Sequence, residues 1–164
     1  MKIRLNRFLL LVVAVAFVLG TQSFLGCDLA GSKSDDSLIG YWKSSYGDGF
    51  ELYYENLQLK FKQYDNASKT VSFAGVVVNN PDLTASTGYI IMQITDAGTW
   101  GKTVGKYYAA HWKDFTGDTV KQNAAYKVGG TKNEGVNSAA EAATEYTVEN
   151  GYYLFIDISV YQRQ

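Results

Sequence analysis

The chain has 164 residues and a formal net charge of −1, and its Lys and Arg residues form no cluster that would suit a nucleic-acid groove or an anionic-lipid patch. A single cysteine rules out an internal disulfide, so a hydrophobic core must supply the stability. The chain is rich in aromatic residues (13 Tyr, 8 Phe and 3 Trp) and in glycine, and has one proline. This mixture favours a sheet protein with many turns.

Residues 1–26 have the pattern of a secretory signal peptide. Lys2, Arg4 and Arg7 make a basic start, and an apolar run of 13 residues, 8–20, follows. That run fits the range of roughly 7–15 residues for a signal-peptide core and falls short of the ~20 residues that a spanning helix needs. A buried apolar helix is the alternative, but the order of basic flank, apolar block and small residue favours a signal peptide.

The only cysteine ends this leader, in the sequence Phe24-Leu25-Gly26-Cys27. The tetrapeptide resembles the lipobox of bacterial lipoproteins at Gly26 and Cys27, while Phe24 and Leu25 depart from its usual residues in the way that spirochaete lipoproteins do. The resemblance implies cleavage before Cys27 and attachment of lipid, such as palmitate, to that residue. Two or more acyl chains hold a protein stably at a membrane. We therefore expect an envelope lipoprotein at the outer membrane or cell surface, with the inner membrane as the alternative.

A polar segment without periodicity follows, and it predicts a flexible tether over residues 27–38. From residue 39 onward, apolar and polar side chains alternate with the period of a β-strand, which predicts a barrel domain over residues 39–164. Gly75, in the middle of one such run, predicts a bulge or bend. Eight strands are predicted, over residues 41–45, 50–54, 57–62, 70–78, 88–95, 106–114, 119–126 and 152–161.

One short helix is predicted before the last strand. Ser138 and Glu141 fit a capping box, and Ala139, Ala142 and Tyr146 fall at helical spacing. The expected fold class is therefore all-β, an antiparallel eight-stranded barrel with a single helix. Closure of the barrel removes the edge strands that invite aggregation, whereas two packed sheets would leave them.

Two family resemblances agree with this expectation. Gly40-Tyr41-Trp42, at the head of the first predicted strand, resembles the Gly-x-Trp that opens lipocalin-like barrels, in which the Trp plugs one end. The tight turn after that strand departs from the long lid loop of true lipocalins. Residues 42–48, 105–113 and 147–153 are similar to stretches of uncharacterised spirochaete surface lipoproteins. The resemblance implies a lipocalin-like barrel in an exported protein. It identifies neither a reaction nor any binding residue.

Residues that carry chemistry are sparse. His111 is the only histidine and no Gly-x-Ser-x-Gly elbow accompanies it, so we expect an exposed or structural role for it. One His and no free Cys do not make a zinc site, and EF-hand spacing is absent, so neither a metal nor a cofactor is expected. Carboxylate pairs form in space, and Glu51, Asp118 and Asp157 are the candidates for one.

Three aromatic residues, Trp42, Tyr108 and Trp112, are the candidates for ligand binding, since pockets are mostly apolar. The alternative is that they fill the core, because an eight-stranded barrel holds its own side chains or one small ligand. We expect a non-catalytic binding or interaction module that takes a small apolar ligand or a protein partner. The alternatives are a hydrolase with a carboxylate pair and an inhibitor that acts through an exposed loop at Pro81 or Trp100.

Overall fold

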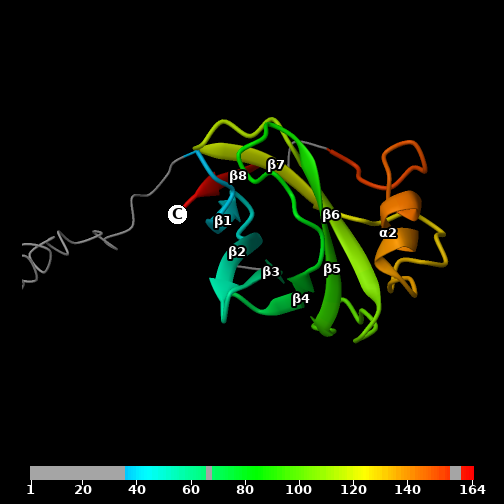
Figure 1. Ribbon diagram of the computed structural model, residues 1–164. Coiled ribbons are helices and arrows are strands. Elements are labelled where there is room, and N and C mark those ends of the chain that lie inside the picture. The colour runs from blue at the N-terminus through cyan, green and yellow to red at the C-terminus, as the bar shows by residue number, and fades with distance from the viewer. Residues whose placement is uncertain (1–35, 66–67, 156–159) are drawn as a thin grey trace, which may run out of the picture. The chain divides into compact units, whose positions relative to one another are not determined.

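Eight strands close into one antiparallel barrel, in which each strand pairs with the next along the chain and β8 returns to pair with β1 (Figure 1). The computed structural model describes residues 36–65, 68–155 and 160–164. The predicted signal peptide, Cys27 and most of the predicted tether lie outside these ranges. The strands are β1 (Gly40–Ser44), β2 (Gly49–Glu55), β3 (Gln58–Tyr64), β4 (Val71–Val77), β5 (Gly88–Asp96), β6 (Tyr107–Lys113), β7 (Thr119–Ala124) and β8 (Val160–Arg163). The predicted fold class is confirmed.

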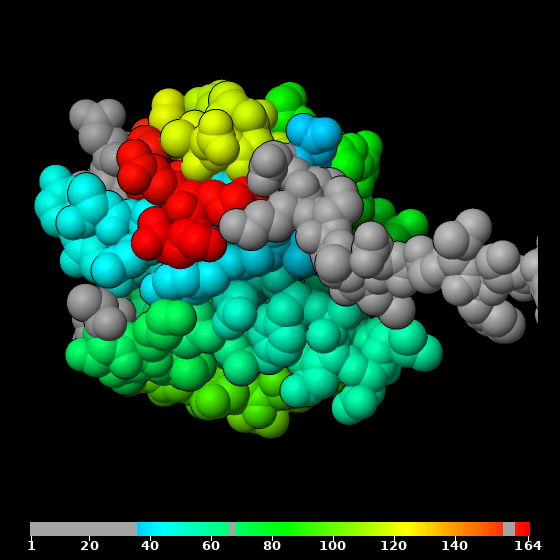
Figure 2. Space-filling view, turned by 90° about the vertical axis from the view of Figure 1, so that its left-hand side faces the viewer, coloured from blue at the N-terminus to red at the C-terminus, as the bar shows by residue number. Residues whose placement is uncertain are grey.

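The barrel seam is made by the shortest strand. Val160, Tyr161 and Gln162 of β8 pair with β7, and residues 161–163 pair with β1. Figure 2 shows this arrangement, with the red residues of β8 between the yellow β7 and the blue β1. Within the described ranges, no helix has the length and apolarity needed to cross a bilayer.

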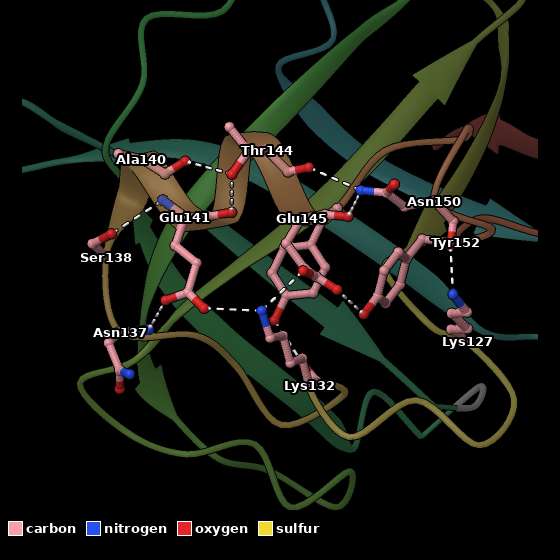
Figure 3. Close-up of polar contacts among 11 residues, drawn as sticks. Lys127, Lys132, Asn137, Ser138, Ala140, Glu141, Thr144, Glu145, Asn150 and Tyr152 are labelled. Carbon is pink, nitrogen blue, oxygen red and sulfur yellow. Dashed lines mark hydrogen bonds and ion pairs between the residues drawn. The ribbon is translucent and has the colours of Figure 1, made fainter.

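The helix α2 (Ala139–Glu145) covers the outer face of β5 and β6 (Figure 1). Ala142 is fully buried in this contact, so the outer face of β5 is apolar as well as the inner one. The predicted cap is present, since the Ser138 hydroxyl accepts a hydrogen bond from the Glu141 N–H at 3.1 Å. Lys132 Nζ ties the helix to the preceding loop through Glu141 at 3.1 Å and Glu145 at 2.9 Å (Figure 3).

Aromatic rings fill the middle of the barrel. Every second residue of a strand points inward, and on neighbouring strands these positions carry large rings. Trp42 stacks on Phe50 with ring centroids 6.0 Å apart, and Phe50 stacks on Phe61 at 6.0 Å. Phe61 in turn stacks on Phe73 at 5.7 Å, and Phe73 meets the edge of Tyr108 at 5.3 Å. This row leaves the interior packed across its width.

Arg163 closes one end of the barrel. Its guanidinium lies 4.4 Å from the centroid of the Trp42 ring, and it donates hydrogen bonds to the carbonyls of Ile39, Ser37 and Gly117 at 2.8, 2.6 and 2.9 Å. Trp42 Nε1 donates to the Leu38 carbonyl at 2.9 Å. The Leu38 side chain is fully buried, so this residue, assigned to the tether from sequence, packs with the barrel.

Most predicted strand boundaries differ from the observed ones by one or two residues, and two strands show differences with an identifiable physical cause. The third strand was predicted from Leu57, but Asn56 and Leu57 form the turn between β2 and β3 with φ values of 52° and 63°. A two-residue turn with both residues in the left-handed region matches the twist of a hairpin. Leu57 is therefore 98 % exposed, although it continues the alternating pattern of β3. The bulge predicted at Gly75 is confirmed, because the register against β5 shifts between Ala74 and Gly75.

The last strand was predicted over residues 152–161, and residues 152–155 are not part of it. Tyr153 has a φ of 68°, a backbone conformation that interrupts an extended strand. The rings of Tyr153 and Phe155 pack instead on the outer face of β6 at His111. Leu154 is 62 % exposed. Residues 156–159 lie outside the described ranges, and β8 begins at Val160.

Candidate functional site

The end of the barrel opposite Arg163 carries two adjoining pockets, and we call this end the mouth. In an antiparallel barrel the β1–β2, β3–β4 and β5–β6 connections gather at one end, and here that end is the mouth. One pocket, which we call the amide pocket, has a volume of about 490 Å³ and the other, the lysine pocket, about 560 Å³. Both include Trp100, Asn123 and Ala124, so a molecule in one pocket contacts the wall of the other.

The amide pocket contains a buried side chain that has no hydrogen-bond partner. Gln122 of β7 points inward, is 1 % exposed, and neither its Nε2 nor its Oε1 is hydrogen-bonded among the described residues. Gln63 of β3, 3 % exposed, lines the same pocket and its Oε1 is likewise unpaired. Burying an unpaired polar group costs about 1–3 kcal/mol. The pocket therefore presents donors and acceptors to any molecule that enters it.

Tyr161 and Asp48, which also line the amide pocket, are hydrogen-bonded to each other. The Tyr161 hydroxyl donates to Asp48 Oδ2 at 2.7 Å, and Ser44 also donates to the Asp48 carboxylate. Burial, together with the negative charge of Asp48, raises the pKa of Tyr161 well above its ordinary value. Tyr161 stays neutral, so the pocket combines a fixed carboxylate with neutral hydrogen-bonding groups.

Lys102 places a cation in the second pocket. It belongs to the loop between β5 and β6, its side chain is 6 % exposed, and Nζ donates to the Tyr108 hydroxyl at 2.8 Å and to the Asn133 carbonyl at 2.5 Å. Burial lowers the pKa of Lys102 to about 8, although the charge of Glu134 acts in the opposite direction. At neutral pH the ammonium form still predominates.

The predicted ligand residues lie in the packed interior. Trp42 and Tyr108 are fully buried and Trp112 is 1 % exposed, and their polar atoms bond to carbonyls of the chain. Trp42 Nε1 donates to Leu38, Trp112 Nε1 to Ala85, and the Tyr108 hydroxyl to Ala125. Among the described residues that line the two mouth pockets, none of the three appears. Tyr108 is connected to the mouth by Lys102, which contacts both its hydroxyl and its ring.

His111 lies on the outer face of β6, where other side chains cover it. It is 7 % exposed, stacks on Tyr89 with centroids 4.2 Å apart, and has the edges of Tyr153 and Phe155 against it. Burial, and to a lesser extent the charge of Lys113, lowers the pKa of His111 to about 4. The ring is neutral at physiological pH and holds residues 152–155 against the barrel, which is a structural role.

Two of the three candidate carboxylates, Glu51 and Asp118, lie apart from each other. Glu51 accepts a hydrogen bond from the Tyr64 hydroxyl at 2.7 Å on the outer face of β2, and Asp118 precedes β7 at the end closed by Arg163. Asp157 lies outside the described ranges. No group of three or more potential metal ligands occurs among the residues that the structure describes.

One carboxylate pair that was not predicted, Glu141 and Glu145, meets at Lys132 beside α2. The Asn137 N–H and Lys132 lower the pKa of Glu141, and Lys132 lowers that of Glu145. A general acid needs the opposite shift. These two carboxylates therefore stabilise the helix.

Sequence reasoning missed Gln63, Gln122 and Lys102. The two glutamines continue the inward-facing alternation of Phe61 and Val120, so a polar residue at a core position was the available signal. Lys102 stands in a glycine-rich loop without periodicity, and no local pattern indicates that the loop folds over the mouth.

Comparison of the chain with protein-family models, curated proteins and solved structures finds no match.

Proposed function

We propose that this protein is a lipid-anchored, non-catalytic binding module of the bacterial cell envelope, and that it holds a small molecule in the mouth of its barrel. The observation that carries the binding role is the buried, unpaired amide of Gln122 beside Gln63. A side chain of leucine size at this position would avoid the cost of an unpaired amide. A ligand that offers both a donor and an acceptor would satisfy the amide.

The packed interior changes the kind of ligand that we expect. The row of rings from Trp42 to Tyr108 occupies the space that a deeply inserted apolar ligand would need. The mouth instead combines apolar walls with hydrogen-bonding groups, which is the usual composition of a small-molecule site. A polar or amphipathic ligand of fragment size therefore suits this protein better than a long apolar chain.

The binding role is tested by substitution of Gln122 with methionine, which has similar volume and no amide. We expect Gln122→Met to raise the free energy of unfolding of the ligand-free protein by about 1 kcal/mol, because the unpaired amide is removed. Binding of aromatic amides and acids from a fragment library, measured by native mass spectrometry and thermal shift, should weaken about tenfold or more. Gln162→Met, at an exposed position of β8, is the matched control.

Two results would count against this role. One is a library in which no compound binds the wild-type mature chain at millimolar concentration. The other is a set of bound compounds whose affinities are the same for wild type and Gln122→Met, which would place the binding elsewhere.

The envelope address is supported by the leader pattern and by the position of Cys27. Mass spectrometry of the chain isolated from a bacterial membrane fraction should find a mature polypeptide that begins at Cys27 and carries a diacylglyceryl thioether. Cys27→Ser should leave the leader attached and remove the lipid. A mature chain with an unmodified thiol, or one that begins at another residue, would refute the anchor.

A further inference from the structure

Lys102 is a buried cation that forms no hydrogen bond or ion pair with a carboxylate among the residues that the structure describes. Its Nζ donates to a hydroxyl and a carbonyl, and it lies 4.0 Å from the centroid of the Tyr108 ring and 5.7 Å from that of Trp100. The ion pairs within the described ranges involve Lys60, Lys121 and Lys132 instead. A buried charge ordinarily has a partner of opposite sign, because its desolvation is costly. The unpaired positive charge of Lys102 therefore favours the binding of an anion at the mouth.

Among the described residues that line the lysine pocket, Glu134 is the one acidic side chain, and it is exposed. Glu134 lines the pocket and its charge acts on Lys102, yet no ion pair joins the two. A carboxylate that remains in water gains little by moving onto a buried ammonium, since it would lose its own hydration. A ligand that joins an anionic group to an apolar group also loses hydration at the anion, but burial of its apolar group offsets that cost.

The walls of the lysine pocket suit such a body. Trp100, Tyr126 and Leu154 line it, and they are 43 %, 52 % and 62 % exposed. Trp100 is also fixed in place, because its Nε1 donates to Asp65 Oδ1 at 2.9 Å and its ring packs on Phe73 with centroids 5.6 Å apart. A rigid, half-exposed indole offers a flat face on which an aromatic ring can stack.

We propose that the mouth binds an aromatic carboxylate, whose negative group pairs with Lys102 Nζ while its ring lies against Trp100. This inference rests on the proposed binding function and names the chemical class of the ligand. The amide pocket shares Trp100, Asn123 and Ala124 with the lysine pocket, so a polar substituent on the ring would extend toward Gln122. Lys102 is the group that selects for charge, and Gln122 and Gln63 are the groups that select for hydrogen bonding.

The test compares two probes of nearly equal shape, 1-naphthylacetate and the neutral 1-naphthylacetamide, by titration calorimetry on the mature chain. A hydrogen bond to a charged group is stronger than one to a neutral group. We therefore expect the affinity for the carboxylate to be at least about tenfold higher than that for the amide. Lys102→Met should remove this preference and leave affinity for the amide within about twofold. Lys102→Arg should retain most of the preference, and Lys43→Met, on the outer face of β1, should change neither affinity.

The comparison of probes on wild-type protein needs no variant, so a Lys102→Met chain that fails to fold does not prevent the test. Equal affinity of wild type for the two probes, or a preference that survives in Lys102→Met, would overturn the inference while leaving the binding function intact. If neither these probes nor any library compound bound at the mouth, the proposed function itself would fail.

Discussion

Single buried polar residues distinguish the two faces of the barrel wall. His111 on the outer face is covered by the rings of Tyr89, Tyr153 and Phe155, and only its Nε2 has a polar neighbour, the Thr87 hydroxyl at 3.2 Å. Gln122 on the inner face has no hydrogen-bond partner in the described part of the chain. Both side chains are more than nine-tenths buried, but only Gln122 borders a pocket at the mouth. The histidine therefore has a structural role, and the glutamine is the residue to which we assign ligand binding in the proposed function.

The burial of His111 makes stability depend on pH. Its pKa is about 4 in the folded protein against 6.5 as the ordinary value, so the unfolded chain binds more protons between these pH values and stability falls as the pH drops from 6.5 to 4. We expect a loss of about 2–3 kcal/mol between pH 7 and pH 4.5, measured by urea denaturation.

The control for this prediction is His111→Phe, which keeps a ring against Tyr89. Its free energy of unfolding should change much less than that of wild type over the same pH interval, even if its value at pH 7 is lower. Equal pH dependence in the two proteins would mean that other groups cause the effect.

At the scale of the elements, alternation in the sequence locates the strands because each strand buries one face. Alternation misleads where residues outside a strand happen to show the same apolar–polar pattern. Leu57 continues the alternation of β3 yet lies in a two-residue turn, and residues 152–155 read as a strand although they pack on His111. Recognising that residues 152–155 are not a strand requires knowledge of what covers the outer face of β6, which is a tertiary contact.

The helix α2 was predictable because its signals are local. The Ser138 cap, the small inward face and the Glu residues that bond Lys132 all lie within 14 residues of one another (Figure 3). We expect Ser138→Ala to lower the free energy of unfolding by about 1 kcal/mol, since one N–H at the start of the helix loses its acceptor. Chemical denaturation measures the change, with Thr144→Ala as an exposed control inside the same helix. No loss in Ser138→Ala would show that tertiary packing alone holds α2.

At the scale of the whole molecule, the eight-stranded count and the helix position follow from sequence, but the two ends of the barrel do not. One end depends on Arg163, which meets carbonyls from the first described residues and from the β6–β7 loop. The other depends on Lys102, which meets Tyr108 and Asn133. These partners are far apart in the chain, so no period or spacing reveals them. The candidate site was therefore missed, although the fold that carries it was predicted.

We expect the guanidinium group of Arg163, and not only its positive charge, to be required for closure of this end of the barrel. Arg163→Lys keeps the charge but cannot donate to three carbonyls from a planar group, so we expect a loss of about 1–3 kcal/mol in the free energy of unfolding. Gln162→Lys, at the exposed neighbouring position, should change stability by less than about 0.5 kcal/mol. Urea denaturation of the two variants tests this, and equal stability of Arg163→Lys and wild type would contradict it.

The central claim, that a small molecule binds at the mouth while the interior stays packed, can be tested with the three tryptophans. Their indole N–H groups bond to Leu38, Asp65 and Ala85, so each reports on a different part of the barrel. In a ¹H–¹⁵N spectrum of the mature chain titrated with 1-naphthylacetate, we expect the Trp100 indole signal to move with a saturating curve and the Trp42 and Trp112 signals to stay in place. Movement of Trp42 or Trp112 with a stationary Trp100, or no movement of any indole signal, would contradict the claim.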